Sequence, residues 1–483
     1  MSPRHSTLVS LLMAITACPS ATQDSEGSPT SATGEQTTTA TTAPTTGTAI
    51  TTDADPTTGT TTAAPTTGEP TTAPGTATTD DPDPGTTTGT TGDPVACDLP
   101  ESPPSAGPSN TGVWRLEQLD LGAHPQAVCN DGTAAVYLIR RNPGATKWLY
   151  FLEGGGNCSD GPTCKQRWNS VKGLDLMSSI SEVERYVNGT LGFPDEGVFA
   201  ADKAENPALH DANFVMIPYC SSDLWSGDRE GDTNLPTSDV GRWHFRGRAI
   251  AHAVLAELLT AEGMDAATDV VLGGGSAGGA GMFINVDELA AELPPAARVL
   301  GMPDAGYQIV YPAFDPKTGL ESTETPTPVE KIALAGFINW GGRGDESCDA
   351  AATDDAERIL CRSAELLTSQ GHITTPLLLI NTQYDYNQTT RLGITVTDDF
   401  KVADPDENAF TVNFAASMRE RLAATDAMHS IFSDYSSLHV TAKSVLAATV
   451  EIDGVTLRDA IAAWHQSPCK VSRRIEQPIA GLP

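Results

Sequence analysis

The sequence predicts an α/β fold in which a mostly parallel central sheet is flanked by helices. Two observations carry this prediction. Short, continuous apolar runs recur along the second part of the chain, and such runs suit strands buried on both faces of a parallel sheet. Longer segments with the apolar periodicity of helices lie between them, and this alternation is typical of parallel strands joined by crossover helices.

The expected strands and helices follow each other from residue 147 onward. The strand-like runs cover residues 147–153 (KWLYFLE), 213–218 (NFVMIP), 268–273 (TDVVLG), 298–303 (RVLGMP) and 376–381 (PLLLIN). The helix-like segments cover residues 246–263, 277–293 and 414–424. The segment that starts at residue 277 lies close behind a strand-like run, so we expect a tight strand-to-helix turn between them.

The first part of the chain has a different composition from the rest. Residues 19–95 contain no Lys, Arg or aromatic residue and consist largely of Thr, Pro, Gly and Ala with some acids. Such a segment cannot bury apolar surface, so we expect residues 18–96 to form a disordered tether. Residues 97–483 have the composition of a globular chain and are long enough to form one large domain.

Residues 1–17 are interpreted as an export signal. Arg4 and His5 precede the apolar stretch LVSLLMAITAC, which is too short to span a membrane. Its end, ITAC, resembles the lipobox of bacterial lipoproteins, in which the signal is cut before a cysteine that is then lipidated. Cys18 is therefore the expected lipidation site, and this anchor would be the only link to a membrane, at the cell surface or outer membrane. An ordinary secretory signal cut nearby is the alternative.

Eight cysteines remain after Cys18, and an even number in an exported chain suggests disulfides. The close pairs Cys158/Cys164 and Cys348/Cys361 are the expected bridges. The other four cysteines are Cys97, Cys129, Cys220 and Cys469, and their spacing leaves their pairing open. Metal binding is the alternative, but the chain lacks the C-x-x-C spacing that is typical of zinc sites.

The formal net charge of −33 excludes some classes of partner. Ten acidic residues and one arginine lie before residue 96, so the remainder of the chain carries −24. A body this acidic repels nucleic acid and anionic membrane surfaces. It also disfavours a strongly anionic polymer as a substrate.

Ser276 is the candidate nucleophile. The stretch GGSAG, from Gly274 to Gly278, fits the pattern G-x-S-x-G and lies between a strand-like run and a helix-like segment. A nucleophile elbow needs this strand–serine–helix order, and the start of the helix favours negative charge beside the serine. The alternative is a glycine-rich turn that leads into a helix N-cap.

A serine nucleophile needs a base and an acid that orients the base, and in chains with this pattern they follow in the order Ser, Asp or Glu, His. Asp385 lies just past a strand-like run, in LLLINTQYDYNQ, and His439 lies downstream in the polar stretch DYSSLHVT. Asp304 and Asp434 are the alternative acids. The other histidines after the serine are His372, His429 and His465.

The glycines of YFLEGGGNC are candidates for an oxyanion hole, which requires N–H groups that point at the developing negative charge. Gly155 and Gly156 each offer an N–H group, and Ala277 offers a third. This loop resembles the H-G-G-G type of hole found in esterases, with Glu153 in the place of the histidine. A plain strand-to-turn connection is the alternative.

Together these stretches resemble the pectin acetylesterase family, a group of Notum-like serine carboxylesterases. The resemblance runs from about Val128 to Trp464. It rests on the stretches VCNDGTAAVYLIRR, WLYFLEGGGNC, FVMIPYCSSDLWSGD, GGGSAGGAGMFINVDEL, MPDAGY and TLRDAIAAWHQ. It implies an α/β-hydrolase fold and a Ser-Asp-His triad, with no metal and no other cofactor.

Position by position, the resemblance implies Ser276 as nucleophile, Asp385 as acid and His439 as base. It implies Gly155, Gly156 and Ala277 as oxyanion donors, and Cys158–Cys164 and Cys348–Cys361 as bridges. One departure concerns the acyl pocket: family members carry a tryptophan after the loop glycines, where this chain has Gly156 and Asn157. Trp225 and Tyr386 are candidates for the missing apolar surface, although packing is the more common role for such residues.

The sequence thus predicts an exported, lipid-anchored serine esterase whose catalytic domain is residues 97–483. The expected substrate is an O-acetyl ester on pectin or another acylated polysaccharide. A deacylase for longer acyl esters is one alternative. A surface binding module that has kept the fold and lost turnover is the other.

Overall fold

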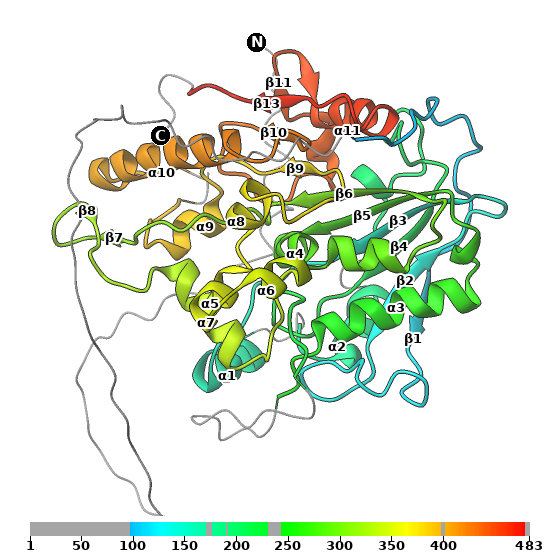
Figure 1. Cartoon of the computed structure of the whole chain (residues 1–483), viewed down its shortest axis with the longest axis horizontal. Coiled ribbons are helices and arrows are strands. Elements are labelled where there is room, and N and C mark those ends of the chain that lie inside the picture. The colour runs from blue at the N-terminus through cyan, green and yellow to red at the C-terminus, as the bar shows by residue number, and fades with distance from the viewer. Residues whose placement is uncertain (1–96, 171–175, 190–191, 230–242, 398–400, 479–483) are drawn as a thin grey trace, which may run out of the picture. The chain divides into compact units, whose positions relative to one another are not determined.

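The computed structural model describes residues 97–170, 176–189, 192–229, 243–397 and 401–478 (Figure 1). The predicted export signal, the lipidation site Cys18 and the predicted tether lie outside these described residues. The structural account below therefore concerns the predicted globular part of the chain.

One sheet of nine strands forms the centre of the described structure, in the order β1-β2-β4-β3-β5-β6-β9-β10-β13. Strands β1 and β2 pair antiparallel with their neighbours, and every pair from β4 to β13 is parallel. The strands are β1 (Arg115–Gln118), β2 (Val136–Arg140), β3 (Lys147–Leu152), β4 (Asn213–Ile217), β5 (Asp269–Gly275), β6 (Arg298–Asp304), β9 (Leu378–Ile380), β10 (Ser430–Ser433) and β13 (Arg473–Ile475). Two small antiparallel pairs are separate from this sheet: β7 (Phe314–Asp315) with β8 (Leu320–Glu321), and β11 (Glu451–Ile452) with β12 (Val455–Thr456).

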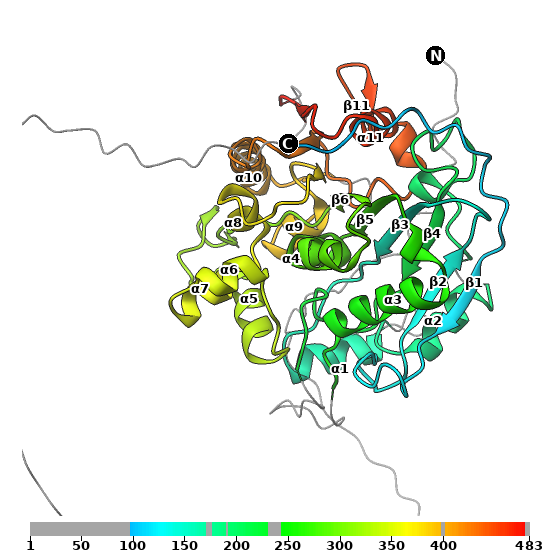
Figure 2. The same cartoon turned by 45° about the vertical axis from the view of Figure 1, so that its right-hand side comes forward.

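The helices connect the strands and cover the sheet. They are α1 (Gly161–Ser170), α2 (Ser179–Tyr186), α3 (Gly247–Ala261), α4 (Ala277–Glu292), α5 (Pro328–Ile338), α6 (Glu346–Ala351), α7 (Asp355–Leu360), α8 (Ala364–Ser369), α9 (Tyr386–Arg391), α10 (Pro405–Ala423) and α11 (Leu457–Gln466). Figures 1 and 2 both show the sheet between α11 on one side and α3 and α4 on the other. Within the described ranges, no helix combines the length and the apolar character needed to cross a membrane.

The two faces of the sheet bury different sets of side chains. Successive side chains of a strand point to opposite faces, so Trp148 and Tyr150 of β3 belong to the core under α3 and α4. Leu149 and Phe151 belong to the core on the α11 side. A strand buried on both faces must be apolar at every position, and this is why the parallel strands read as continuous apolar runs.

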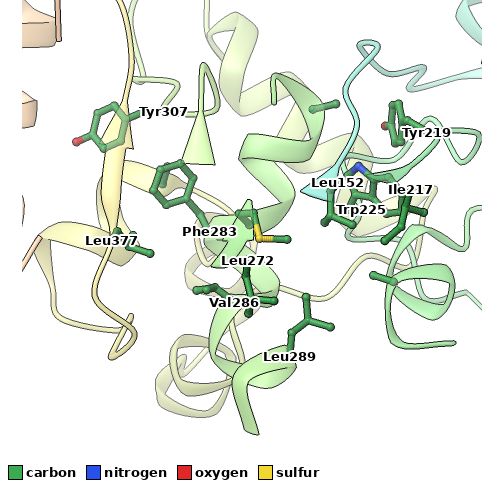
Figure 3. Close-up of a cluster of buried hydrophobic side chains, with 14 of the residues drawn as sticks. Leu152, Ile217, Tyr219, Trp225, Leu272, Phe283, Val286, Leu289, Tyr307 and Leu377 are labelled. Atoms are coloured by element: carbon green, nitrogen blue, oxygen red, sulfur yellow. The ribbon is translucent and has the colours of Figure 1, made fainter. Parts of the chain in front are cut away.

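The core between α4 and the sheet supports the end of β5. Figure 3 shows Leu272 of β5 close to Phe283 and Val286 of α4. Tyr219 and Trp225 pack nearby with ring centroids 5.3 Å apart. The turn between β5 and α4 is therefore anchored at both of its ends by close packing.

The five expected strands are present with boundaries that differ by at most a few residues, and α3 and α4 match the expected helices. The expected helix over residues 414–424 is the second half of a longer one, because α10 begins at Pro405. The Asp404 side chain accepts the N–H groups of Asp406 and Glu407 at 2.9 and 3.1 Å and so caps the helix there. The polar first half of α10 lacks the apolar periodicity on which the prediction depended.

Four disulfides are present in the described structure. Both close pairs are bridged, Cys158 with Cys164 and Cys348 with Cys361. The pairing that spacing left open is Cys97 with Cys469 and Cys129 with Cys220. Bridges in this number are typical of extracellular proteins, which fold in an oxidising compartment.

Candidate active site

Ser276 lies in the turn between β5 and α4. Its φ of +54° and ψ of −117° are strained for a residue with a side chain, as is typical of a nucleophile elbow. The outer glycines of GGSAG make the turn possible, because a Cβ on Gly274 would lie 2.3 Å from the carbonyl oxygen of Gly278. A Cβ on Gly278 would lie 2.0 Å from the carbonyl oxygen of Leu152, at the end of β3. The spacing of the motif therefore reflects the close approach of main-chain segments.

The Ser276 side chain is half-buried and does not cap the helix that follows. Ser276 occupies the N-cap position of α4, but its side chain makes no capping hydrogen bond in the described structure. Its main-chain N–H donates to the carbonyl oxygen of Asp304 at 2.8 Å, which joins the turn to the end of β6. The simpler interpretation of this stretch, a turn whose serine caps a helix, does not describe the observed geometry.

Asp385 and His439 form a short side-chain pair. Asp385 follows β9 as the N-cap of α9 and is completely buried. Its Oδ1 accepts the N–H groups of Asn387 and Gln388 at 2.9 and 3.1 Å, so the carboxylate has a fixed orientation. Its Oδ2 accepts the Nδ1–H of His439 at 2.5 Å. This arrangement holds one nitrogen of the imidazole and leaves Nε2 to act as a base.

His439 belongs to the loop that follows β10, residues 434–444, called the base loop below. The Tyr386 N–H, next to Asp385 in the chain, donates to the carbonyl oxygen of Ser437 in this loop at 3.0 Å. The Tyr386 and His439 rings meet edge to face, with centroids 5.8 Å apart. Main-chain and ring contacts therefore fix the histidine beside its carboxylate.

The base loop lies against the serine turn. Val440, which follows His439, has a φ of +53°, and a Cβ on Gly275 would lie 2.9 Å from its Cγ1. The chain neighbours of Ser276 and His439 are thus in contact, although no hydrogen bond joins those two side chains among the described residues. The serine hydroxyl can rotate, and catalytic hydrogen bonds are often long before substrate binds. The predicted nucleophile and base therefore lie at the same edge of the sheet.

The glycine loop after β3 packs directly on the serine turn. A Cβ on Gly154 would lie 2.6 Å from the Ser276 Cβ and 3.2 Å from the Ala277 nitrogen, so only glycine fits there. Gly155 and Gly156 follow with φ of +153° and +74°, which residues with side chains rarely adopt. The N–H groups of these two glycines have no acceptor among the described residues. They directly follow Gly154, which packs on the serine, so they are the candidates for the donors that an oxyanion hole requires.

Arg167 of α1 fixes the orientation of the glycine loop. Its Nη1 donates to the carbonyl oxygen of Gly155 at 2.6 Å, and its Nε donates to the Ser222 hydroxyl at 2.8 Å. In a trans peptide the carbonyl of one residue and the N–H of the next point in opposite directions. By holding the Gly155 carbonyl, Arg167 therefore aims the N–H of Gly156. No local pattern around Arg167 in the sequence indicates this role.

Glu153, which the sequence placed where some esterases have a histidine, belongs to a buried polar cluster. Its carboxylate accepts the Tyr186 hydroxyl at 2.5 Å and the Lys443 Nζ at 3.1 Å. Burial alone would raise the pKa of Glu153, but the charges of Lys443 and Arg185 hold it below its usual value. This ion pair links the start of the glycine loop to the end of the base loop.

The alternative acids Asp304 and Asp434 have partners other than the imidazole of His439. Asp304 Oδ2 accepts two main-chain N–H groups of the base loop, and Asp434 accepts the Ser436 hydroxyl. Burial raises the pKa of Asp304 to about 7 and that of Asp434 to about 6. In the described structure Asp385 is therefore the carboxylate that orients His439.

The remaining histidines lie elsewhere. His372 Nδ1 lies 2.9 Å from the Ser347 hydroxyl, and burial lowers the pKa of His429 to about 4. His465 contacts Asp269 at the opposite edge of the sheet, with 3.1 Å between Nε2 and Oδ2. Across the described ranges, no three His, Cys, Asp or Glu side chains gather as metal ligands would.

The three predicted pocket residues have different surroundings. Asn157 is half-buried in the glycine loop, and Tyr386 is half-buried beside His439. Trp225 is completely buried, and its Nε1 donates to the Glu153 carbonyl oxygen at 2.9 Å. Trp225 therefore supports the start of the glycine loop from the core. The prediction that Trp225 lines the pocket is corrected, because its role is packing.

An apolar cavity opens beside α4, on the side of the helix that faces α5. Its volume is about 50 Å³. Its lining includes Leu224, Ala280, Ile284, Val310, Val329, Ile332, Ala333 and Trp340, with Glu330 and Arg362 as the charged residues. Ala280 lies one helical turn after Ser276, so the cavity begins close to the serine. An apolar cavity next to a nucleophile can hold the acyl part of an ester.

Comparison with known proteins gives matches in both sequence and structure. The family model described as Pectinacetylesterase matches residues 110–480. The palmitoleoyl-protein carboxylesterase NOTUM of Homo sapiens is 35% identical over 235 residues, which cover 48% of this chain and 44% of that protein. The palmitoleoyl-protein carboxylesterase notum1a of Danio rerio is 30% identical over 359 residues, or 74% of this chain and 66% of that protein. The chain thus spans 44% to 66% of the length of these relatives.

A solved structure of the Wnt deacylase Notum from Drosophila superposes on the described fold with a TM-score of 0.62 at 25% sequence identity. The match covers 75% of this chain and 96% of that one. The arrangement of a mostly parallel sheet flanked by helices is therefore the α/β-hydrolase arrangement that the sequence predicted.

Proposed function

The chain belongs to the pectinacetylesterase family, and on that premise we propose that it is an exported serine esterase. The observation that carries this proposal is the 2.5 Å hydrogen bond between Asp385 and His439, next to the elbow that presents Ser276. A buried carboxylate that holds Nδ1–H keeps the imidazole in the form whose Nε2 can take a proton. This chemistry activates a serine toward an ester carbonyl.

The proposed reaction has two halves. The Nε2 of His439 takes the Ser276 proton while Oγ attacks the ester carbonyl, and the N–H groups of Gly155, Gly156 and Ala277 stabilise the oxyanion. Collapse of the tetrahedral intermediate breaks the ester bond, and the alcohol leaves with the proton from His439. Water then attacks the acyl-enzyme with His439 again as base, which releases the acid and restores Ser276.

The proposed substrate is an O-acetyl ester on a polysaccharide such as pectin. The family description supports this choice, and so does the polar Asn157 at the place in the glycine loop where an aromatic side chain would add apolar surface. The acidic body favours a neutral or weakly charged polymer over a strongly anionic one.

A second candidate is a deacylase for longer acyl esters, and the apolar cavity beside α4 favours it. Its lining is mostly apolar, and each methylene group buried against it would add about 0.8 kcal/mol of binding. The relatives from Homo sapiens and Danio rerio are named as palmitoleoyl-protein carboxylesterases. Glu330 and Arg362 argue for the shorter substrate, because a long acyl chain would desolvate their charges.

We further propose that the protein reaches the cell surface as a lipoprotein, with the lipid on Cys18 and residues 19–96 as its tether. The sequence ITAC and the lack of aromatic residues in the tether support this proposal. Metabolic labelling with a radioactive fatty acid tests it. Label in the wild-type chain and none in Cys18→Ala is the expected result, and equal labelling of both contradicts it.

The experiment that tests the function is an acyl chain-length profile. The purified wild-type chain and Ser276→Ala are assayed on p-nitrophenyl esters from acetyl to long acyl chains. We expect activity to be highest on acetyl and the variant to lose about 10⁶-fold in kcat. The Ser276→Ala change removes one half-buried hydroxyl that caps no helix and should leave the melting temperature nearly unchanged, which serves as the folding control.

Each other outcome selects an alternative. A maximum at longer chains identifies the deacylase for longer acyl esters. Turnover that survives in Ser276→Ala contradicts the serine mechanism. No turnover of any ester by a folded wild-type chain contradicts the enzyme and favours the surface binding module. If acetyl is preferred, acetate release from pectin and from acetylated xylan then separates the polymers.

A further inference from the structure

We propose that Asp304 is a positioning residue of this site, which holds the base loop against the serine turn. The proposal rests on the proposed esterase function, because it assigns Asp304 a role in placing the base of that reaction. Within the described ranges Asp304 makes no hydrogen bond to the imidazole of His439, which is oriented by Asp385.

The main chain of Asp304 forms one half of this link. Asp304 is the last residue of β6 and lies in register with Gly275 of β5 and Ile380 of β9. Its carbonyl oxygen accepts the N–H of Ser276 at 2.8 Å. A Cβ on Gly279 would lie 2.4 Å from the same oxygen, so the first turn of α4 packs directly on it. Asp304 is therefore fixed with respect to the serine turn.

The side chain of Asp304 forms the other half. Its Oδ2 accepts the N–H of Thr441 at 2.8 Å and the N–H of Ala442 at 2.7 Å. These donors follow His439 by two and three residues in the base loop. A carboxylate that accepts two main-chain N–H groups makes charge-assisted hydrogen bonds, which are stronger than neutral ones. One residue thus joins the segment of the nucleophile to the segment of the base.

The base loop needs such an attachment at this point. Val440 adopts a φ of +53°, which is a strained conformation for a β-branched residue. The strain lies between His439 and the two N–H groups that Asp304 accepts. Without the carboxylate those N–H groups would lack their acceptor, and Val440 could relax and carry His439 away from Ser276. Misplacement of a catalytic group by about 1 Å can lower a rate by about 100-fold.

Ionised Asp304 lowers the stability of the fold, because burial disfavours its charge. Such a cost in stability supports a functional role. Asp304 is only 1% exposed, and this burial raises its pKa to about 7. The two N–H groups and His439 act in the opposite direction and lower the pKa, whereas the charge of Asp385 raises it. A raised pKa means that this group stabilises the fold most at acidic pH and that the contribution is lost as the pH rises to about 7. Asparagine would keep an oxygen acceptor without this cost in stability.

The test compares Asp304→Ala, which removes the acceptor, with Asp304→Asn, which keeps one oxygen. Asp269→Asn is the matched control, because Asp269 is also buried but lies at the start of β5, the far end of the strand that leads to Ser276. We expect Asp304→Ala to lower kcat by about 100-fold with less than about a threefold change in KM. We expect Asp304→Asn to recover at least about tenfold of that loss, and Asp269→Asn to keep the wild-type kcat.

Two further measurements separate positioning from a loss of stability. Hydrogen exchange should become faster in the peptide that covers residues 434–444 in Asp304→Ala, and should stay slow there in Asp269→Asn. The melting temperature of Asp304→Asn, relative to wild type, should rise between about pH 5 and about pH 8, while its kcat is below wild type at about pH 8. A variant that is more stable and yet slower cannot owe its lost activity to unfolding.

The proposal is overturned if folded Asp304→Ala keeps the wild-type kcat, or if the base loop keeps its slow exchange. It is also overturned if Asp304→Asn is as slow as Asp304→Ala, because the accepted hydrogen bonds would then not explain the loss. If Asp304→Ala does not fold, the proposal is decided by Asp304→Asn alone. The measurements are then hydrogen exchange in residues 434–444 and the melting temperature as a function of pH. Labelling of Ser276 by a fluorophosphonate checks the proposed function separately, since an unlabelled wild type contradicts the esterase while the exchange measurement still tests Asp304.

Discussion

The sheet carries an aspartate–histidine pair at each of two opposite edges, and the two pairs differ in their surroundings. Asp385 and His439 lie beside the turn that follows β5, with 2.5 Å between Oδ2 and Nδ1. Asp269, the first residue of β5, lies 3.1 Å from Nε2 of His465. By distance and burial alone, either pair could serve as the acid and base of a hydrolase.

Arg298 makes the difference at the start of β5. Its Nη2 donates to the same oxygen of Asp269 at 2.8 Å, and its Nη1 donates to the His465 carbonyl. Burial would raise the pKa of Asp269, but His465 and Arg298 hold it below its usual value. Burial lowers the pKa of His465, which is 3% exposed. A carboxylate shared with a guanidinium cannot direct its charge to an imidazole, so this pair has the character of a structural ion cluster.

The comparison teaches that a short Asp–His contact does not by itself identify a catalytic pair. Around His439 the base loop contacts a strained serine turn, and the glycine loop packs on that turn from another side. Around His465 the neighbours are an arginine and tightly packed main chain. The function is therefore assigned by what surrounds the pair.

The largest expected effect breaks the pair beside the serine. Asp385→Asn should lower kcat by about 10⁴-fold, because the amide cannot hold the imidazole in the form that accepts a proton. His465→Gln, the matched change at the other pair, should leave kcat within about threefold of wild type. Turnover of p-nitrophenyl acetate measures both. A comparable loss of kcat in folded His465→Gln would mean that the two pairs had been assigned the wrong way round.

A smaller effect is expected from the glycine loop. Arg167→Ala frees the Gly155 carbonyl and lets the N–H of Gly156 turn away from the oxyanion, which should lower kcat about tenfold. Arg167→Lys keeps the charge but not the two-point contact and should recover little of the loss. Burst kinetics with an activated ester give the acylation rate directly. An unchanged acylation rate in Arg167→Ala would show that the loop needs no such support.

The smallest effect on activity is expected at the start of β5. Asp269→Asn leaves Arg298 without its carboxylate and should lower the free energy of unfolding by about 3 kcal/mol with kcat unchanged. The folded-state pKa of Asp269 is depressed, so its stabilising effect is present at neutral pH and lost as the pH falls. The difference between variant and wild type should therefore shrink under acid conditions. Urea unfolding at neutral and acidic pH measures it, and a difference that grows in acid would contradict this account.

The sequence predicted those parts of the fold and site that local patterns encode. Continuous apolar runs identified β3, β4, β5, β6 and β9. Chain order left several acids and histidines open, and the family resemblance selected Asp385 and His439 among them. Gly274 and Gly278 could be recognised because the turn needs both glycines within a few residues of the serine.

Other features depend on contacts between distant segments and have no local signal. The role of Asp304 requires the β5 turn and the base loop to meet, and they are far apart in the chain. The link from Glu153 to Lys443 joins residues 290 positions apart. Trp225 was a pocket candidate because aromatic residues suit both pockets and cores, and only its complete burial distinguishes the two.

The bridge between Cys97 and Cys469 has a mechanical consequence. The two cysteines are 372 positions apart, so the bond closes nearly the whole described domain into one covalent loop. When the chain is pulled between its two ends, tension passes from residue 97 to residue 469 through the sulfur atoms. Eight of the nine strands of the sheet, the serine turn and the base loop lie inside the loop and are shielded from extension, whereas β13 lies outside it. A pulling force along the polypeptide therefore bypasses the elements inside the loop and acts on β13, where it pairs with β10.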